Sequence, residues 1–289
     1  MYYLKNSIGM QLKLMCCKKG FQLSFLINMV VALLIYLYHV FSAWGQDVSK
    51  IVSPSAAFML LDTNSLFEAY ITLVPFIVVL PFAMSFVTDR SNMVLPALQT
   101  RGSVKTYYIA KAIACFAGGM IVFLIPCAMN IILNNLTFPQ SGVTFVGDLY
   151  DWNYNAHLMG INVAKTTKWV GIWFPRIYIN HPEVYNIIIA MFFSVSMGIF
   201  SVFSYAVSFY LTKHKILLFV PLYVVVVLFN TLDMILVDIY PYTCTKIMMY
   251  ITGNTMYGKN PMFLYTFFVC MGLVTVVLLS KQIGKDQIE

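Results

Sequence analysis

The sequence predicts an all-α integral membrane protein. Of its 289 residues, 60% are hydrophobic and only 10% are charged, and the mean hydropathy is +0.80. A soluble domain carries about 25% charged residues, so this chain has too little polar surface to face water on all sides. Its apolar residues also gather into runs of about 20, the length at which an α-helix crosses the roughly 30 Å hydrocarbon layer of a bilayer.

Six apolar runs are expected to be membrane-spanning helices, which together form a single transmembrane domain over residues 1–289. The runs lie at about 21–44, 66–88, 109–133, 185–211, 215–237 and 262–280. The first is longer than the core of a cleaved signal peptide, which is about 7–15 residues, so we interpret it as a retained span. Pro75 and Pro81 predict a bend, or freed backbone groups, in the second run.

The distribution of basic residues predicts that both ends of the chain are cytoplasmic. Lys and Arg are enriched in the short cytoplasmic loops of membrane proteins. With both ends inside, most of the 18 Lys and Arg residues fall on the cytoplasmic side, in 1–20, 89–111, 212–215 and 281–289. Because retention of these residues explains the net charge of +7, no nucleic-acid partner is expected.

Four segments outside the expected spans have distinct characters. Residues 1–20 mix lysines with apolar residues, as in an amphipathic helix at the inner interface or an ordinary basic flank. Residues 45–65 are expected to be a polar outer segment. The long segment 134–184 holds three of the four tryptophans and is expected to be folded against the outer face. Residues 238–261 are apolar but too short to span, which indicates a re-entrant or interfacial segment.

No motif for catalysis or metal binding is present in the sequence. It lacks the phosphate-binding pattern Gly-x-x-x-x-Gly-Lys-Ser/Thr, the zinc pattern His-Glu-x-x-His and the nucleophile pattern Gly-x-Ser-x-Gly. Its six cysteines and four histidines show no metal-binding spacing. We therefore expect that this chain is not an enzyme and holds no cofactor or metal.

Four polar residues lie within or at the ends of the expected spans. Glu68 opens the second span, and Asp233 lies near the outer end of the fifth. Ionisable residues at membrane depth often mark a transport path, although both of these can also reach the outer headgroups. Asn130 and Asn230 can form hydrogen bonds between helices or line a polar seam.

The connector between the second and third spans, residues 89–111, is both basic and apolar. Its basic residues are Arg90, Arg101, Lys105 and Lys111, and its middle holds Met93, Val94, Leu95, Ala97 and Leu98. This middle is too apolar for an idle solvated loop and too short to cross a bilayer. We interpret the connector as a docking element for a soluble partner.

This connector resembles that of the type-2 ABC-transporter permeases. The resemblance is carried by a span that ends in Phe-Val-Thr-Asp-Arg-Ser at residues 86–91, a short apolar helix near residues 94–99, and an Arg-Gly-Ser turn at residues 101–103 that leads into the next span. The six-span layout, the amphipathic N-terminus and the segment before the last span also match this family.

The resemblance implies a permease subunit that pairs with a second permease, as a homo- or heterodimer, and with separate cytosolic ABC ATPase chains. ATP and Mg²⁺ would bind to those ATPases. Residues 94–99 would be a coupling helix that docks in the ATPase, and an amphipathic or hydrophobic peptide, lipid-linked or drug-like molecule would move outward through a bacterial plasma membrane. The residues expected at the docking contact are Asp89, Arg90, Met93, Leu95, Leu98 and Arg101.

Two other classes of function fit parts of the sequence. A membrane-anchored sensor or immunity protein would bind an extracellular peptide through residues 134–184 without moving it. A membrane-embedded lipid-modifying enzyme would use Glu68, Asp233 or the same outer segment, but the sequence has no paired inward carboxylates or histidines to support it. An ATPase that co-purifies with the chain would distinguish an exporter from both.

Overall fold

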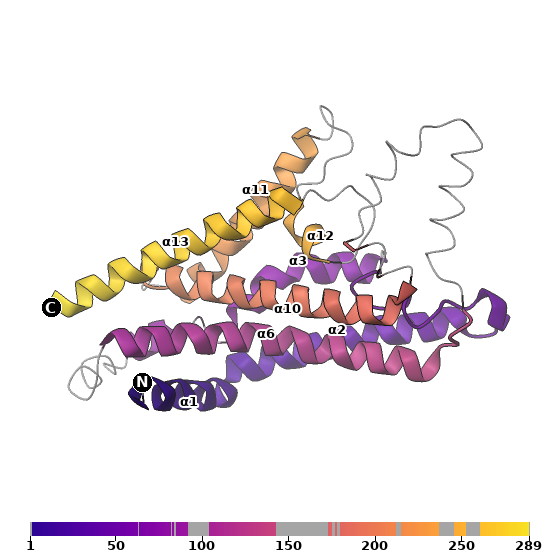
Figure 1. Ribbon diagram of the computed structural model, residues 1–289, viewed down its shortest axis with the longest axis horizontal. Helices are drawn as coiled ribbons and strands as arrows, with labels where there is room; N and C mark the ends of the chain where they lie inside the picture. Colours follow the sequence, from indigo (N-terminus) through magenta and orange to yellow (C-terminus); the bar gives the residue numbers. More distant parts are fainter. Residues whose placement is uncertain are drawn as a thin grey trace.

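A computed structural model describes residues 2–62, 64–81, 83, 85–91, 104–142, 173–174, 177, 180–211, 215–236, 246–252 and 261–288. Every regular element in these ranges is a helix (Figure 1). The α-helices are α1 (Tyr2–Cys17), α2 (Lys19–Ala43), α3 (Ser65–Val79), α4 (Ser85–Ser91), α6 (Val104–Thr137), α10 (Pro182–Val207), α11 (Val220–Leu236), α12 (Ile247–Ile251) and α13 (Pro261–Ile288). Two short 3₁₀ helices, η1 (Val48–Lys50) and η3 (Lys215–Phe219), complete them.

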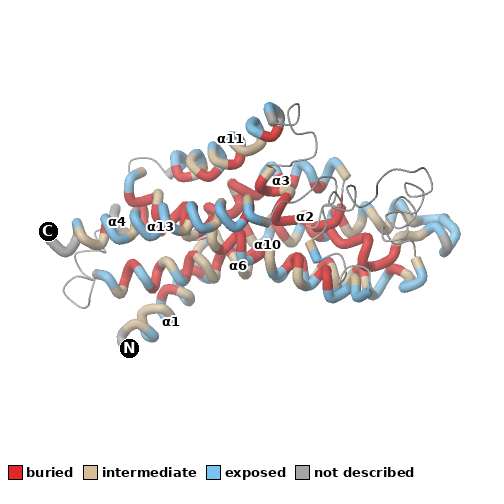
Figure 2. Tube along the Cα trace, turned by 45° about the horizontal axis from the view of Figure 1, so that its top comes forward, coloured by how far each residue is buried: buried red, intermediate tan, exposed pale blue. Residues whose placement is uncertain are grey.

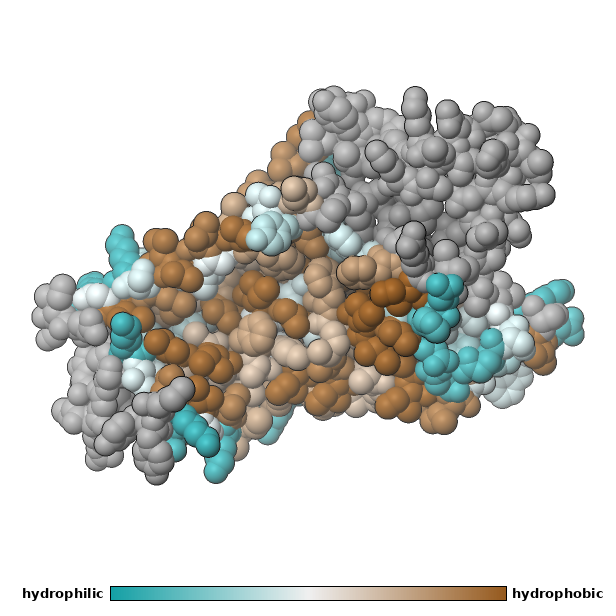
Figure 3. Space-filling model, viewed as in Figure 1, coloured by the Kyte–Doolittle hydropathy of each residue, from teal (hydrophilic) through white to brown (hydrophobic). Residues whose placement is uncertain are grey.

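Within the described ranges, five helical segments are long and apolar enough to cross a membrane. They are α2, residues 105–137 of α6, α10, residues 216–233 across η3 and α11, and residues 262–285 of α13. In the face shown in Figure 3, hydrophobic side chains cover the middle of the molecule and hydrophilic ones gather toward its two ends. The predicted class of all-α, multi-pass membrane protein is therefore confirmed.

The second expected span, 66–88, is divided in the structure. α3 has 15 residues, about 22 Å of helix, which is shorter than the hydrocarbon layer. It ends before Pro81, and the chain becomes helical again in α4. Proline lacks an amide hydrogen and clashes with the preceding turn, which explains a helix break here. Pro75 lies inside α3 without ending it.

α6 and α10 form the centre of the bundle and make its most extensive helix contact (Figure 1). Two glycines allow their close approach. A Cβ at Gly119 would lie 2.8 Å from the Ser201 Cβ, and a Cβ at Gly198 would lie 2.9 Å from the Phe116 ring. The buried residues concentrate along this contact (Figure 2). Small residues let helices pack closely in membranes, as Gly119 and Gly198 do here.

α1 and α2 both pack against α6, and α1 lies on the side of α6 that faces away from α10 (Figure 1). α1 is helical, which fits the first of the two alternatives for residues 1–20, and its Met15 side chain is buried at Gly118 of α6. α11 and α13 are much less buried than α6 and α10, and each turns a broad apolar surface outward. Such surfaces are stable in a bilayer because lipid chains, rather than water, contact them.

Residues 45–65 were predicted to be a polar outer segment, but residues 53–62 do not form a solvent-facing loop in the structure. All ten of these residues are buried, although none lies in a helix. Asp62 accepts a hydrogen bond from Asn64, whose own side chain accepts one from the Phe67 amide and so caps α3. His39 of α2 lies 3.0 Å from Asp62 and links the two helix ends. The apolar run 56–61 therefore folds back into the bundle.

Candidate functional site

The strongest concentration of buried charge lies where α4 ends and α6 begins, on either side of the connector. Asp89 belongs to α4, and Tyr107 and Lys111 belong to the first turns of α6. The Tyr107 hydroxyl donates to Asp89 Oδ2 at 2.8 Å, and Lys111 Nζ donates to the same oxygen and to the Tyr107 oxygen, the latter at 2.8 Å. We refer to these three residues as the Asp89 cluster.

Burial makes the Asp89 cluster energetically important. The Lys111 side chain is 0% exposed and that of Asp89 is 20% exposed. Lys111 Nζ also lies 5.1 Å from the centre of the Tyr107 ring, within the range of a cation–π contact. A charge buried this deeply is stable only when it is paired and hydrogen-bonded, so Asp89 is required to keep Lys111 in place.

Aromatic packing fixes α4 on its other side. Phe86 of α4 contacts Tyr205 and Phe209 at the end of α10, with ring centroids 6.2 and 4.6 Å away. Tyr108 of α6 contacts Phe86 and Phe209 at 5.8 and 5.3 Å. Edge-to-face pairs of this kind add stability beyond the area they bury. α4, α6 and α10 are thus joined at this end of the bundle by both charge and packing.

A second polar network lies at the other end of the bundle and contains only neutral side chains. Asn130 of α6 accepts a hydrogen bond from the Met59 amide at 3.0 Å and donates to the Ala32 carbonyl of α2 at 3.1 Å. Asn134 donates to the Ala57 carbonyl at 2.8 Å and to Asn130 at 3.1 Å. Asn186 of α10 donates to the Ser55 carbonyl at 3.0 Å. These three asparagines bind the backbone of the buried segment 53–62, and we refer to them as the asparagine clamp.

The predicted docking residues are only partly within the described chain. Asp89 lies in the Asp89 cluster, and Arg90 follows it in α4. Met93, Leu95, Leu98 and Arg101 lie outside the described residues. Contact of these six residues with a partner stays a prediction.

The four predicted path or interhelix residues lie in different parts of the bundle. Asn130 makes interhelix contacts, in agreement with one of the two predicted roles. Glu68 is exposed in the first turn of α3, and Asn230 is half-buried on α11. Asp233 is buried, and its Oδ2 lies 3.8 Å from Lys246 Nζ at the start of α12. The structure does not gather them into one site, and a transport path through them stays a prediction.

Sequence reasoning gave no role to Tyr107 and counted Lys111 only as a positive charge. A signal for the pairing was nevertheless present. Lys111 lies inside an apolar run, where a lysine requires an acidic partner. Asp89 is the only acidic residue between Glu68 and Asp148. Tyr107 lies four residues before Lys111, so the two share a helix face.

Comparison of the chain with known protein-family models, with curated proteins and with solved structures finds no match in any of the three. The candidate site is therefore interpreted from its own geometry.

Proposed function

We propose that this chain is the membrane subunit of an ATP-driven exporter similar to the type-2 ABC permeases. In this proposal it has six spans, the second formed by α3 and α4 together, and both of its ends are cytoplasmic. The five helices of spanning length support the layout. The two chain ends lie toward the same end of the long axis (Figure 1), which is what an even number of spans requires.

The observation that carries the proposal is the Asp89 cluster. It joins α4 and α6, the two helices that flank the connector. The joining contacts are the Lys111–Asp89 ion pair and the Tyr107 hydroxyl, which donates to Asp89 and accepts from Lys111. A partner that displaces the connector would therefore move α4 and α6 together, because these contacts couple the two helices. Since α6 packs along α10, the displacement would reach the centre of the bundle. Rigid-body switching between two arrangements is a common way to change which side a cavity faces.

The connector itself is proposed to bind a cytosolic ABC ATPase, which holds ATP and Mg²⁺. Residues 94–99 form the coupling helix, with Met93, Leu95 and Leu98 as apolar anchors and Arg90 and Arg101 as charges that set the orientation. Because the Asp89 carboxylate is engaged within the chain, we assign it the role of holding the connector in place.

Transport is proposed to occur at the interface of two permeases, a homo- or heterodimer, in a bacterial plasma membrane. The cargo is an amphipathic or hydrophobic peptide, lipid-linked or drug-like molecule that moves outward. The resemblance of the connector supports this class of cargo, and the membrane-spanning fold is compatible with it.

The test is to reconstitute the chain with an ATPase that co-purifies with it and to measure nucleotide hydrolysis and export in vesicles. Replacement of Leu95 and Leu98 by Asp is expected to abolish export and its coupling to hydrolysis, while the protein still inserts in the membrane. The matched control is Leu136→Asp at the far end of α6, where the native side chain is 79% exposed. This control is expected to leave coupling intact.

The proposal fails if the Leu95→Asp/Leu98→Asp variant still transports at the native rate. It also fails if the purified chain responds to an extracellular peptide with no ATPase present, because that result would identify a sensor. Activity on lipid by the isolated chain in detergent, without nucleotide, would identify an enzyme.

A further inference from the structure

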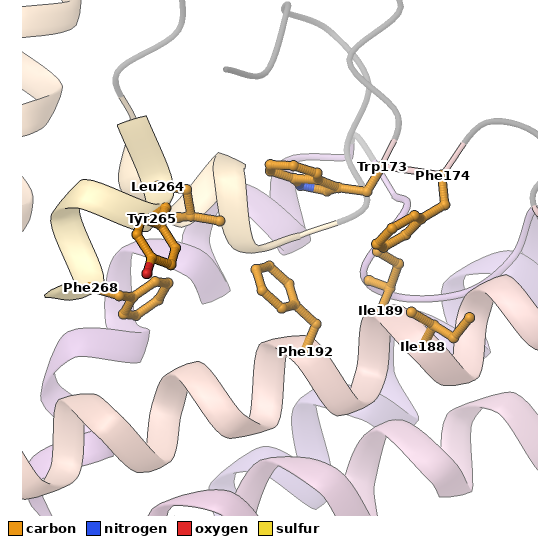
Figure 4. A pocket seen from close by; sticks show the side chains of 8 residues that line it. All are labelled: Trp173, Phe174, Ile188, Ile189, Phe192, Leu264, Tyr265 and Phe268. Atoms are coloured by element: carbon orange, nitrogen blue, oxygen red, sulfur yellow. The ribbon is translucent and has the colours of Figure 1, made fainter. Parts of the chain in front are cut away.

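A hollow of about 270 Å³ lies on the flank of the bundle between α10 and α13 (Figure 4). α10 lines it with Ile188, Ile189 and Phe192, and α13 lines it with Leu264, Tyr265 and Phe268. None of the described residues that line it is charged. The hollow therefore provides hydrocarbon and aromatic surface and no partner for a charged ligand.

Its position along the two helices corresponds to the hydrocarbon layer. Ile188 and Phe192 follow the start of α10 at Pro182 by roughly 9–15 Å of helix. Leu264 and Phe268 lie in the first two turns of α13. Both helices are long and apolar enough to cross a membrane, and when they span it, residues at this distance from their starts fall within one half of the hydrocarbon layer.

The lip of the hollow is formed by two aromatic residues before α10. Trp173 donates its Nε1 hydrogen to the Tyr250 carbonyl at 2.7 Å, so its polar group is bound to α12 while its ring faces the hollow (Figure 4). Phe174 has φ = 54°, a left-handed conformation that bulky residues rarely adopt. The Ile177 amide donates to the Phe174 carbonyl and stabilises this turn.

The mouth of the hollow opens to the surroundings of the bundle. Phe174 is 56% exposed and Tyr265 is 71% exposed, whereas Ile189 and Leu264 behind them are buried. When α10 and α13 span a bilayer, the medium outside them is lipid. An apolar hollow of this kind does not retain water, which needs two or more polar partners. Hydrocarbon that entered it would gain dispersion contacts with every wall.

We propose that this hollow is a binding site for an acyl chain of a bilayer lipid. The chain lies between α10 and α13 with its methylene groups against Phe192 and Phe268. This proposal depends on the membrane-spanning fold and not on the export function, so either can fail without the other.

The test uses the full chain in nanodiscs of phosphatidylglycerol and phosphatidylethanolamine that contain a trace of phosphatidylcholine with a diazirine near the end of one acyl chain. After illumination, peptide mapping locates the adducts. We expect labels concentrated on the peptides that carry residues 188–192 and 264–268. Ile188→Trp, which fills the hollow, is expected to reduce the label on 264–268 several-fold. Ile188→Phe is a smaller filler that serves if the tryptophan variant does not fold.

The matched control is Ile187→Trp, because Ile187 is the neighbouring residue of α10, is 54% exposed and does not line the hollow. This control is expected to leave the label on 264–268 unchanged. The proposal is overturned if adducts spread evenly over lipid-facing residues such as Leu228 and Val276 and neither filler changes them. It is also overturned if an unlabelled amphipathic peptide in excess displaces the label, since the hollow would then belong to a peptide.

Discussion

The two ends of the bundle are held together by different kinds of polar contact. At one end, the Asp89 cluster joins α4 to α6 through an ion pair whose lysine is completely buried. At the other, the asparagine clamp joins α2, α6 and α10 to the segment 53–62 through neutral amides. Removing one partner of a buried ion pair costs the protein much stability in a single step. Removing one hydrogen bond from a set made by amide side chains costs much less.

This difference fits two distinct mechanical roles. The asparagine clamp satisfies the backbone of a buried, non-helical segment, which cannot be left without partners at membrane depth. It thereby links that segment to α2, α6 and α10 at one end of the bundle. The Asp89 cluster instead joins two helices, whose backbone groups are hydrogen-bonded within each helix. Under the proposed function, it makes the two sides of the connector move as one.

The largest effect is expected from Asp89→Asn. Loss of the carboxylate leaves the ammonium group of Lys111 buried without a counter-charge, which should destabilise the protein by about 3–5 kcal/mol. Thermal unfolding of the purified protein in detergent measures the loss. The double variant Asp89→Asn/Lys111→Met removes both charges and is expected to recover most of the stability. If the single variant is as stable as the native chain, the contrast between the charged Asp89 cluster and the neutral asparagine clamp is wrong.

A smaller effect is expected from Asn130→Leu in the asparagine clamp. Asn130 makes three hydrogen bonds, to Met59, Ala32 and Asn134. Interhelical hydrogen bonds in membrane proteins contribute about 0.6 kcal/mol each, so the loss should be roughly 2 kcal/mol. The same unfolding measurement applies.

The control for this variant is Asn135→Leu on the same helix, because the hydrogen bonds of the Asn135 side chain are to positions nearby in the sequence: it donates to the Ile131 carbonyl and accepts from the Gln140 side chain. A similar loss in both variants would mean that the clamp is no more than local helix capping.

The smallest effect is expected from Asn186→Leu. Its side chain makes a single hydrogen bond across the bundle, to the Ser55 carbonyl. The expected loss is about 0.6 kcal/mol. Hydrogen exchange of the amides in residues 53–62 is the more sensitive measurement, since exchange should rise there while the amides of α4 are unaffected. A rise at both ends would show that the ends are coupled and not independent.

Several features of the fold were predictable from local sequence. The helical, membrane-embedded class follows from composition, and Pro81 indicated the interruption of the second span. In contrast, residues 53–62 were predicted to belong to a polar outer segment because their few polar residues resemble a loop, whereas they are buried and bonded to asparagines that are more than 70 residues away in the sequence.

The sequence by itself determined that this chain belongs in a membrane and that its long segments are helices. The physical reason is that transfer from water to lipid is nearly additive over residues, so length and composition are sufficient to predict it. Only the tertiary structure decided that Asp89 pairs with Lys111, that three asparagines enclose an outer segment, and that α10 and α13 leave a hollow between them. Those features depend on contacts between residues that are far apart in the sequence, and such contacts are set by how the helices pack.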